Sequence, residues 1–122
     1  MAYTINPSDD HTHIILIVKG DINRMTALNQ NLEAHALGRK LGITRYFVDL
    51  TESRNTESVT DQYEFAYKDM RSAEGIDRHA RIAVLVSADD HSHDFIETVA
   101  RNSGLNFKLF ADREKAMSFL ME

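Results

Sequence analysis

Residues 81–87 read RIAVLVS, and residues 45–52 read RYFVDLTE. Each stretch contains a short run of β-branched and aromatic residues that is almost entirely apolar, which is typical of a strand buried on both faces. Helical patterns flank both runs and separate them along the chain. Strands that alternate with helices indicate parallel pairing through right-handed crossovers. The sequence therefore predicts an α/β domain built around a mostly parallel sheet.

The N-terminal residues predict an antiparallel edge for this sheet. Residues 2–5 and 13–19 are strand-like, and the turn-forming stretch 6–10 (NPSDD) lies between them. Two such strands joined by a short polar loop form a hairpin. Gly20 and Asp21 then end the second strand.

Helix signals complete the order of elements. Asn23 is a suitable N-cap and Gly42 a suitable C-terminal cap for a first helix, in which Met25, Leu28, Leu32 and Ala36 recur at helical spacing. The remaining elements are a strand at 46–50, a polar loop at 51–58, a helix at 59–75, a strand at 81–87, a helix at 94–102, a strand at 106–110, and a final helix after the cap Asp112. We expect one domain over residues 1–122, with a four- or five-stranded mixed sheet and four helices.

Composition narrows the classes of function. The chain has 122 residues, no Cys and a formal net charge of −5. The lack of Cys excludes disulfides, thiolate catalysis and Cys-bound zinc. An acidic surface argues against nucleic acid as a partner, because phosphate binding requires a basic patch. The start of the chain has no signal-peptide pattern and the longest unbroken apolar run is 14–18, so we expect a cytoplasmic protein.

Two groups of the form Asp-Asp-His-x-His stand out, at residues 9–13 and 89–93. Imidazole and carboxylate are good ligands for zinc, iron or manganese, so a small metal-dependent enzyme is one hypothesis. The first group precedes a strand and the second follows a parallel strand, which places them at opposite ends of the sheet. We therefore expect both to be solvated turns, with Asp90 or Ser92 capping the next helix.

Other catalytic patterns are missing from the sequence. It has no Gly-x-Ser-x-Gly elbow, no phosphate-binding glycine loop and no dinucleotide fingerprint. Asp49 and Ser87 lie at predicted strand ends, as do the residues of phospho-acceptor receiver sites. Such a site also needs a Lys after the last strand, but Lys108 lies within that strand. We expect Asp49 to be satisfied by loop amides, and we expect no catalytic role, no metal and no cofactor.

Three stretches carry a resemblance to a known family: IILIVKGDI at 14–22, RYFVDLTE at 45–52 and RIAVLVSADD at 81–90. With the opening hairpin and the Leu-rich first helix, they resemble the STAS group of anti-sigma-factor antagonists over nearly the whole chain. The likeness is closest to the SpoIIAA-like branch, which is described as STAS/SEC14-like. It implies a STAS-like mixed sheet with four helices.

The resemblance implies a regulatory site at the start of the second helix. In antagonist STAS proteins an Asp-Ser-Ser-Gly type motif opens this helix, and one of its Ser residues is phosphorylated by a partner kinase. The matching residues are Glu57, Ser58, Val59 and Thr60, so Val59 replaces the Ser that is usually modified. Ser58 is thus a candidate phosphoryl acceptor, and its alternative role is an N-cap, with Asp61 in the first turn.

The SEC14-like side of the resemblance implies an apolar crevice between helices and sheet. Residues 63–70 give the second helix a wider apolar surface than one packing stripe needs, although core packing also explains it. We expect Tyr63, Tyr67 and Met70 to line a contact surface or crevice, and Phe65 to point away from them. Asp21 and Ser87 would flank this surface from the strand ends.

These observations favour a non-catalytic regulatory or ligand-binding module. Its partner would be a small apolar or lipid-like ligand, or a protein, at the face of the second helix. Peripheral membrane association and a homodimer remain open, as does a purely self-associating module, and nucleic acid is not expected. Phe119, Leu120 and Met121 cannot all face inward from one helix, so they form a second candidate docking patch.

Overall fold

The computed structural model describes residues 2–56, 58–65, 68, 75, 77, 79–102 and 104–122, apart from the side chains of residues 59, 62 and 99. In chain order the elements are β1 (Ala2–Pro7), β2 (Ile14–Ile22), α1 (Arg24–Leu41), β3 (Arg45–Asn55), α2 (Val59–Glu64), β4 (Arg81–Leu85), α3 (Asp94–Asn102), β5 (Asn106–Phe110) and α4 (Arg113–Met121).

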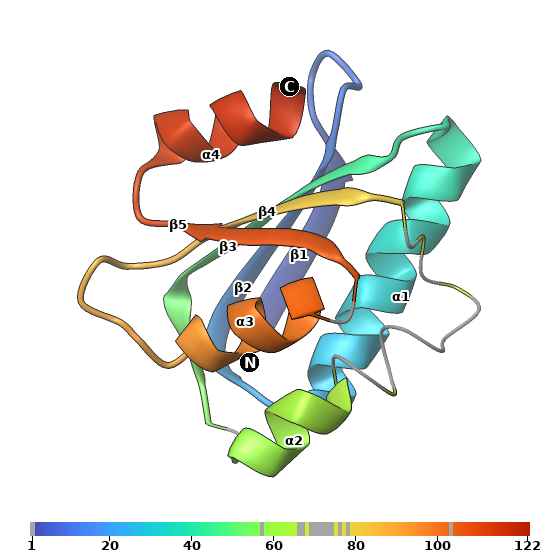
Figure 1. The fold of residues 1–122 in the computed structure, drawn as a ribbon. Helices are drawn as coiled ribbons and strands as arrows, with labels where there is room; N and C mark the ends of the chain where they lie inside the picture. Colours follow the sequence, from blue (N-terminus) through green and yellow to red (C-terminus); the bar gives the residue numbers. More distant parts are fainter. Residues whose placement is uncertain are drawn as a thin grey trace.

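The five strands form one sheet in the order β1-β2-β3-β4-β5. β1 pairs with β2 antiparallel, and the other three pairs are parallel. Because every parallel crossover moves in the same direction across the sheet, right-handed connections carry their helices over the same face. Figure 1 shows α1 and α3 on that face and α4 on the opposite one. The predicted α/β fold with an antiparallel N-terminal edge is confirmed.

The sheet separates two apolar cores. The larger core lies under α1 and includes Ile14, Leu16, Val18, Tyr46, Leu50, Ile82 and Val84. On the same face, Ile96 and Ala100 of α3 form a smaller cluster with Leu105. The second lies under α4 and includes Phe47, Ala83, Leu85, Ala116 and Leu120. Alternation along β4 sends even-numbered residues to the first core and odd-numbered residues to the second.

The predicted helix caps are confirmed. Asn23 Oδ1 accepts from Thr26 N–H at 3.0 Å, which satisfies one of the free amides at the start of α1. Gly42 follows α1 with a φ of 71°, a left-handed conformation that favours glycine. Asp112 accepts from the Glu114 and Lys115 amides at the start of α4.

The buried face of α1 differs from its apolar pattern. Met25 is 67% exposed, whereas Gln30, Ala34, His35 and Gly38 are buried. The His35 ring stacks on Tyr46 with a centroid distance of 4.1 Å, and a Cβ on Gly38 would lie 2.0 Å from Tyr46 Oη. The close approach of α1 to Tyr46 of β3 therefore determines which face of the helix is buried. The helical spacing of apolar residues that begins at Met25 does not mark this face.

The strands end at different residues from those predicted. β1 continues through Asn6 and Pro7, which Pro tolerates because β1 is an edge strand. β2 continues to Ile22 and β3 to Asn55, because residues 19–22 pair with residues 52–55. β4 ends at Leu85, two residues earlier than expected.

The predicted second helix over residues 59–75 is confirmed only in its first part. α2 covers Val59–Glu64, and residues 66, 67 and 69–74 lie outside the described part of the chain.

We predict that Gly38→Ala destabilises the protein by about 1–3 kcal/mol, because the added methyl group overlaps the Tyr46 hydroxyl and the Ile43 carbonyl. Urea unfolding monitored by circular dichroism measures this loss. Ala36→Gly on the exposed side of α1 is the matched control, with a loss of about 1 kcal/mol from helix propensity alone. A Gly38→Ala protein as stable as the wild type would show that this close approach is not required.

Candidate functional site

An apolar cavity of about 70 Å³ lies between the sheet and the helices α1, α2 and α3. Its floor is formed by side chains from the middle strands, including Leu16, Val18, Val48, Leu50, Ile82 and Val84. Ala27 lines it from α1, Phe65 from the chain just beyond α2, and Ile96 from α3. Polar residues from strand and helix ends complete the lining: Asn23, Arg24, Gln30, Asn31, Asn55, Asp61 and His93.

A bulge in β3 explains how polar residues join an apolar floor. Between the pairs Ile17–Asp49 and Lys19–Glu52, β2 advances by two residues and β3 by three. One extra residue reverses the alternation of the strand beyond that point. Val48 therefore lines the cavity from an even position before the bulge and Asn55 from an odd position after it.

The edge of β3 beyond Asp49 is completed by side chains instead of a strand. β4 ends at Leu85, the residue paired with Asp49, so β4 offers no backbone partner further on. Three side chains from the next segment replace it, at alternate residues of β3 whose backbone groups point the same way. Ser87 Oγ donates to the Thr51 carbonyl at 2.9 Å, His93 Nε2 lies 3.3 Å from the Ser53 carbonyl, and the Asn55 amide donates to Ser92 Oγ at 3.1 Å.

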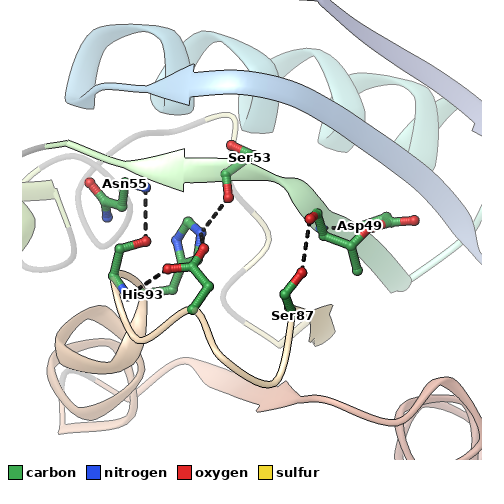
Figure 2. Close-up of polar contacts among 8 residues, drawn as sticks. Asp49, Ser53, Asn55, Ser87 and His93 are labelled. Carbon is green, nitrogen blue, oxygen red and sulfur yellow. Dashed lines mark hydrogen bonds and ion pairs between the residues drawn. The ribbon is translucent and has the colours of Figure 1, made fainter.

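Figure 2 shows these side chains reaching from the segment between β4 and α3 to β3. We call Ser87, Ser92 and His93, with Asp90, the β3 clasp. Asp90 Oδ1 accepts from the Ser92 amide at 2.9 Å, and Asp90 Oδ2 lies 3.7 Å from His93 Nε2. The clasp fixes where α3 starts and therefore fixes one wall of the cavity.

Burial of the His93 ring within the clasp favours its neutral form. The ring is 1% exposed, and burial lowers its pKa, although the Ser53 carbonyl and Asp90 act in the opposite direction. A carbonyl oxygen can only accept, so the proton of the neutral ring is assigned to Nε2. Burial raises the pKa of Asp90, but its hydrogen bonds from Ser92 and the nearby His93 outweigh this and leave the pKa below its ordinary value.

One ion pair lies in the cavity lining, between the starts of α1 and α2. Arg24 Nη1 and Asp61 Oδ1 are 4.0 Å apart, with side chains that are 30% and 44% exposed. Opposite charges at this distance cancel at long range, so the lining presents no net charge from this pair to a ligand.

The two Asp-Asp-His-x-His groups lie at opposite ends of the sheet, because one precedes β2 and the other follows β4. The expectation that both are solvated turns is wrong for the last His of each group. His13 is 8% exposed and packs edge-on to Phe47, and His93 is buried in the clasp. Within the described residues, no group of three or more His, Asp or Glu side chains could hold a metal ion.

Asp90 or Ser92 was expected to cap α3. Ser92 Oγ instead accepts from the Asn55 amide of β3, and Asp90 Oδ1 accepts from the Ser92 amide. This clasp was missed because an Asp-Asp-His-x-His string resembles a turn or a metal site. The sequence carries no local signal for it, because residues 51–55 are polar and resemble a loop.

The residues predicted for the site are only partly brought together. Ser58 and Tyr63 lie at the outer side of α2, and Tyr63 is 48% exposed. Asp21 is exposed on β2, and Ser87 binds the β3 backbone and lines a separate open hollow beside Asp94. Tyr67 and Met70 lie outside the described residues, and the binding roles of all six stay predictions.

Phe65 is placed differently from the expectation, whereas the end of α4 agrees with it, because Phe119, Leu120 and Met121 do not all face inward. Phe65, expected to point away, lines the cavity and packs with Ile96 and Ala100. In α4, Leu120 is fully buried, Phe119 packs against its core, and Met121 is 41% exposed.

Asp49 is satisfied as predicted and also forms an ion pair. Its Oδ1 accepts from the Thr51 amide at 2.9 Å, and its Oδ2 lies 3.3 Å from Arg113 Nη2. These contacts give Asp49, which lies within β3, a structural role.

Comparison with known proteins identifies the fold. No family model matches the chain, and no curated protein matches it. A crystal structure of an uncharacterized DUF3478-family protein from Shewanella loihica PV-4, with a SpoIIAA-like fold, superposes with a TM-score of 0.56 at 18% identity. The match covers 98% of this chain and 92% of the other.

The chain has a SpoIIAA-like fold. In the part of the chain that the structure describes, none of the helices combines the length and apolar character needed to cross a membrane. In this SpoIIAA-like fold, the cavity lies on the face covered by α1 and α3, away from α4.

We predict that stability falls as the pH drops from about 6.5 toward 4. Burial lowers the pKa of His35 from 6.5 to about 4 and also lowers the pKa of His93. As the pH falls, the histidines of the unfolded chain therefore bind protons before the buried histidines of the folded chain do. The free energy of unfolding begins to fall near the ordinary histidine pKa. Urea unfolding at several pH values measures the slope, which should be shallower in His35→Gln. Equal stability at pH 7 and pH 4.5 would contradict this assignment.

We predict that Ser58 stabilises the first turn of α2. The Asp61 amide donates to Ser58 Oγ at 3.1 Å, which is N-cap geometry. Ser58→Ala should increase hydrogen exchange at the α2 amides, equivalent to about 1 kcal/mol, whereas Ser58→Asn, which also caps, should leave exchange near the wild-type rate. Equal exchange in Ser58→Ala and the wild type would remove the capping role.

Proposed function

We propose that this chain is a non-catalytic regulatory module that binds a small apolar ligand in the cavity between its sheet and α1, α2 and α3. The observation that carries the proposal is an apolar cavity of about 70 Å³ between the sheet and the helices that cover this face. Interiors of proteins pack with few voids larger than a water molecule, so a void of this size is a feature to be explained.

The volume of the cavity limits the ligand. A water molecule needs about 10–15 Å³ of such space, so 70 Å³ accommodates about five to seven non-hydrogen atoms. Pockets for drug-sized ligands are larger, at about 300–1,000 Å³. The described walls therefore favour a small molecule over a whole lipid.

The position of α2 supports a regulatory role. Asp61 and Phe65 line the cavity from α2 and its continuation, while Tyr63 on the same segment is 48% exposed. A ligand that packs against Phe65 favours one placement of this segment, and it thereby changes the surface around Tyr63. The SpoIIAA-like fold is a regulatory STAS-type architecture, which agrees with a ligand-dependent change in the surface around Tyr63. Under this proposal a protein partner binds the surface around Tyr63, and its affinity depends on whether the ligand is bound.

We predict that Ala27→Leu weakens ligand binding at least about tenfold, because three added carbon atoms occupy a cavity that holds about five to seven. Toluene is the probe, titrated against ¹⁵N-labelled protein by NMR. Native mass spectrometry of the freshly purified protein also reports any retained small ligand. The stability of Ala27→Leu should equal or exceed that of the wild type, because filling a cavity is stabilising.

The matched control is Ala36→Leu, the same change at an exposed position of the same helix, and it should bind toluene as the wild type does. Equal toluene affinity in Ala27→Leu and the wild type, or no binding to either, would overturn the proposed function.

A further inference from the structure

We infer that the outer edge of β1 pairs with β1 of a second copy of this chain, antiparallel and about a two-fold axis at Thr4. The two five-stranded sheets then form one continuous sheet. This inference concerns a different surface from the cavity and does not depend on the proposed ligand.

The outer side of β1 is an uncovered sheet edge. β1 is the first strand in the sheet order, and β2 is its only strand partner among the described residues. Ala2, Thr4 and Asn6 are exposed, and Tyr3 is 42% exposed. An edge strand presents a row of N–H and C=O groups with which another strand can pair.

The direction of the backbone groups shows what this edge offers. Ser8 N–H donates to the His13 carbonyl at 2.8 Å, just beyond the end of β1. Backbone groups alternate in direction along a strand, so the even-numbered residues of β1 face β2 and the odd-numbered ones face outward. Tyr3 and Ile5 therefore each present an N–H and a C=O group to the outside, and Pro7 presents only its C=O.

The opposite edge of the sheet, at β5, is protected against such pairing. The outward amide of Leu109 donates to the Glu97 carboxylate of α3. Lys108 in the middle of β5 is exposed, and a lysine on an edge strand discourages pairing with another strand. β1 contains no charged residue, and Pro7 at its end limits the length of the pairing without preventing it.

The sequence of β1 is complementary to itself in one register. When Thr4 lies opposite Thr4 of the second copy, Tyr3 lies opposite Ile5, and each such pair exchanges both backbone hydrogen bonds. A register centred on Ile5 instead sets Tyr3 opposite Pro7, which has no N–H to donate to the Tyr3 carbonyl. Aromatic and β-branched residues form favourable cross-strand pairs, as do two Thr residues. The register at Thr4 therefore satisfies every outward group of Tyr3 and Ile5.

The charges near β1 allow this pairing. In a two-fold interface a residue on the axis meets its own copy, and like charges that meet are destabilising. Lys19 of β2, the partner of Ala2, forms an ion pair with Glu52 at 3.5 Å. Glu33 of α1 is engaged by Tyr3, and a hydrogen bond between them raises the pKa of the Tyr3 phenol. The net charge of −5 acts over longer distances, where salt screens it.

Sedimentation velocity of the wild type across a concentration series, in about 0.15 M salt, tests the association. The mass should rise from that of a 13.9 kDa monomer toward that of a dimer. Thr4→Lys and Thr4→Glu each place like charges opposite each other on the axis, so each alone should associate at least about tenfold more weakly. An equal mixture of the two should associate at least as tightly as the wild type, because opposite charges then face each other.

A disulfide tests the register, because the chain has no Cys of its own. Opposed residues that exchange no hydrogen bonds have Cα atoms about 4.5 Å apart, a distance that a disulfide spans. Thr4→Cys should therefore form a covalent dimer under mild oxidation. Asn6→Cys is the matched control, because Asn6 lies opposite Ala2 of the second copy. The two introduced thiols are then about 14 Å apart along the strands and cannot be bridged.

A wild type that stays monomeric throughout the concentration series would overturn this inference. Association of Thr4→Lys and Thr4→Glu alone as tight as that of the wild type would also overturn it, as would equal cross-linking of Thr4→Cys and Asn6→Cys. Either of these results would place the contact between copies elsewhere.

Discussion

The length mismatch between β3 and β4 is the constraint on which the site depends. β3 runs six residues beyond Asp49, the last residue that pairs with β4. Backbone groups on that edge would be left without partners, at a cost of about 1–3 kcal/mol for each one that is buried. Ser87, His93 and Ser92 supply the missing partners at Thr51, Ser53 and Asn55.

The cavity follows from the way this constraint is met. α3 begins at Asp94, directly after the clasp, and its position sets the separation between Ile96 and the floor residue Ile82. The bulge at Asp49 then turns Asn55 toward the same space. One loop thus completes the edge of β3 and shapes the cavity.

Local signals predicted the frame of the molecule. The runs at β3 and β4 indicated parallel strands because burial on both faces demands continuous apolar sequence. Asn23, Gly42 and Asp112 marked helix ends because capping depends on residues that are adjacent in sequence. These features need no knowledge of distant parts of the chain.

The site could not be predicted in the same way. Residues 51–55 are polar and resemble a loop, and only pairing with β2 and the clasp makes them a strand. The bulge reverses which residues face inward, and a single sequence carries no signal for it. His93 gains its role from Ser53, forty positions away, and Gly38 from contact with Tyr46.

The central claim is that a dry, ligand-sized space exists between the sheet and α1, α2 and α3. A crystal structure determined under xenon pressure tests it most directly, because xenon enters apolar cavities and leaves polar or filled ones empty. The account predicts a xenon atom in contact with Ile82, Ile96 and Phe65. Ordered water in that space, or side chains that fill it, would contradict the account.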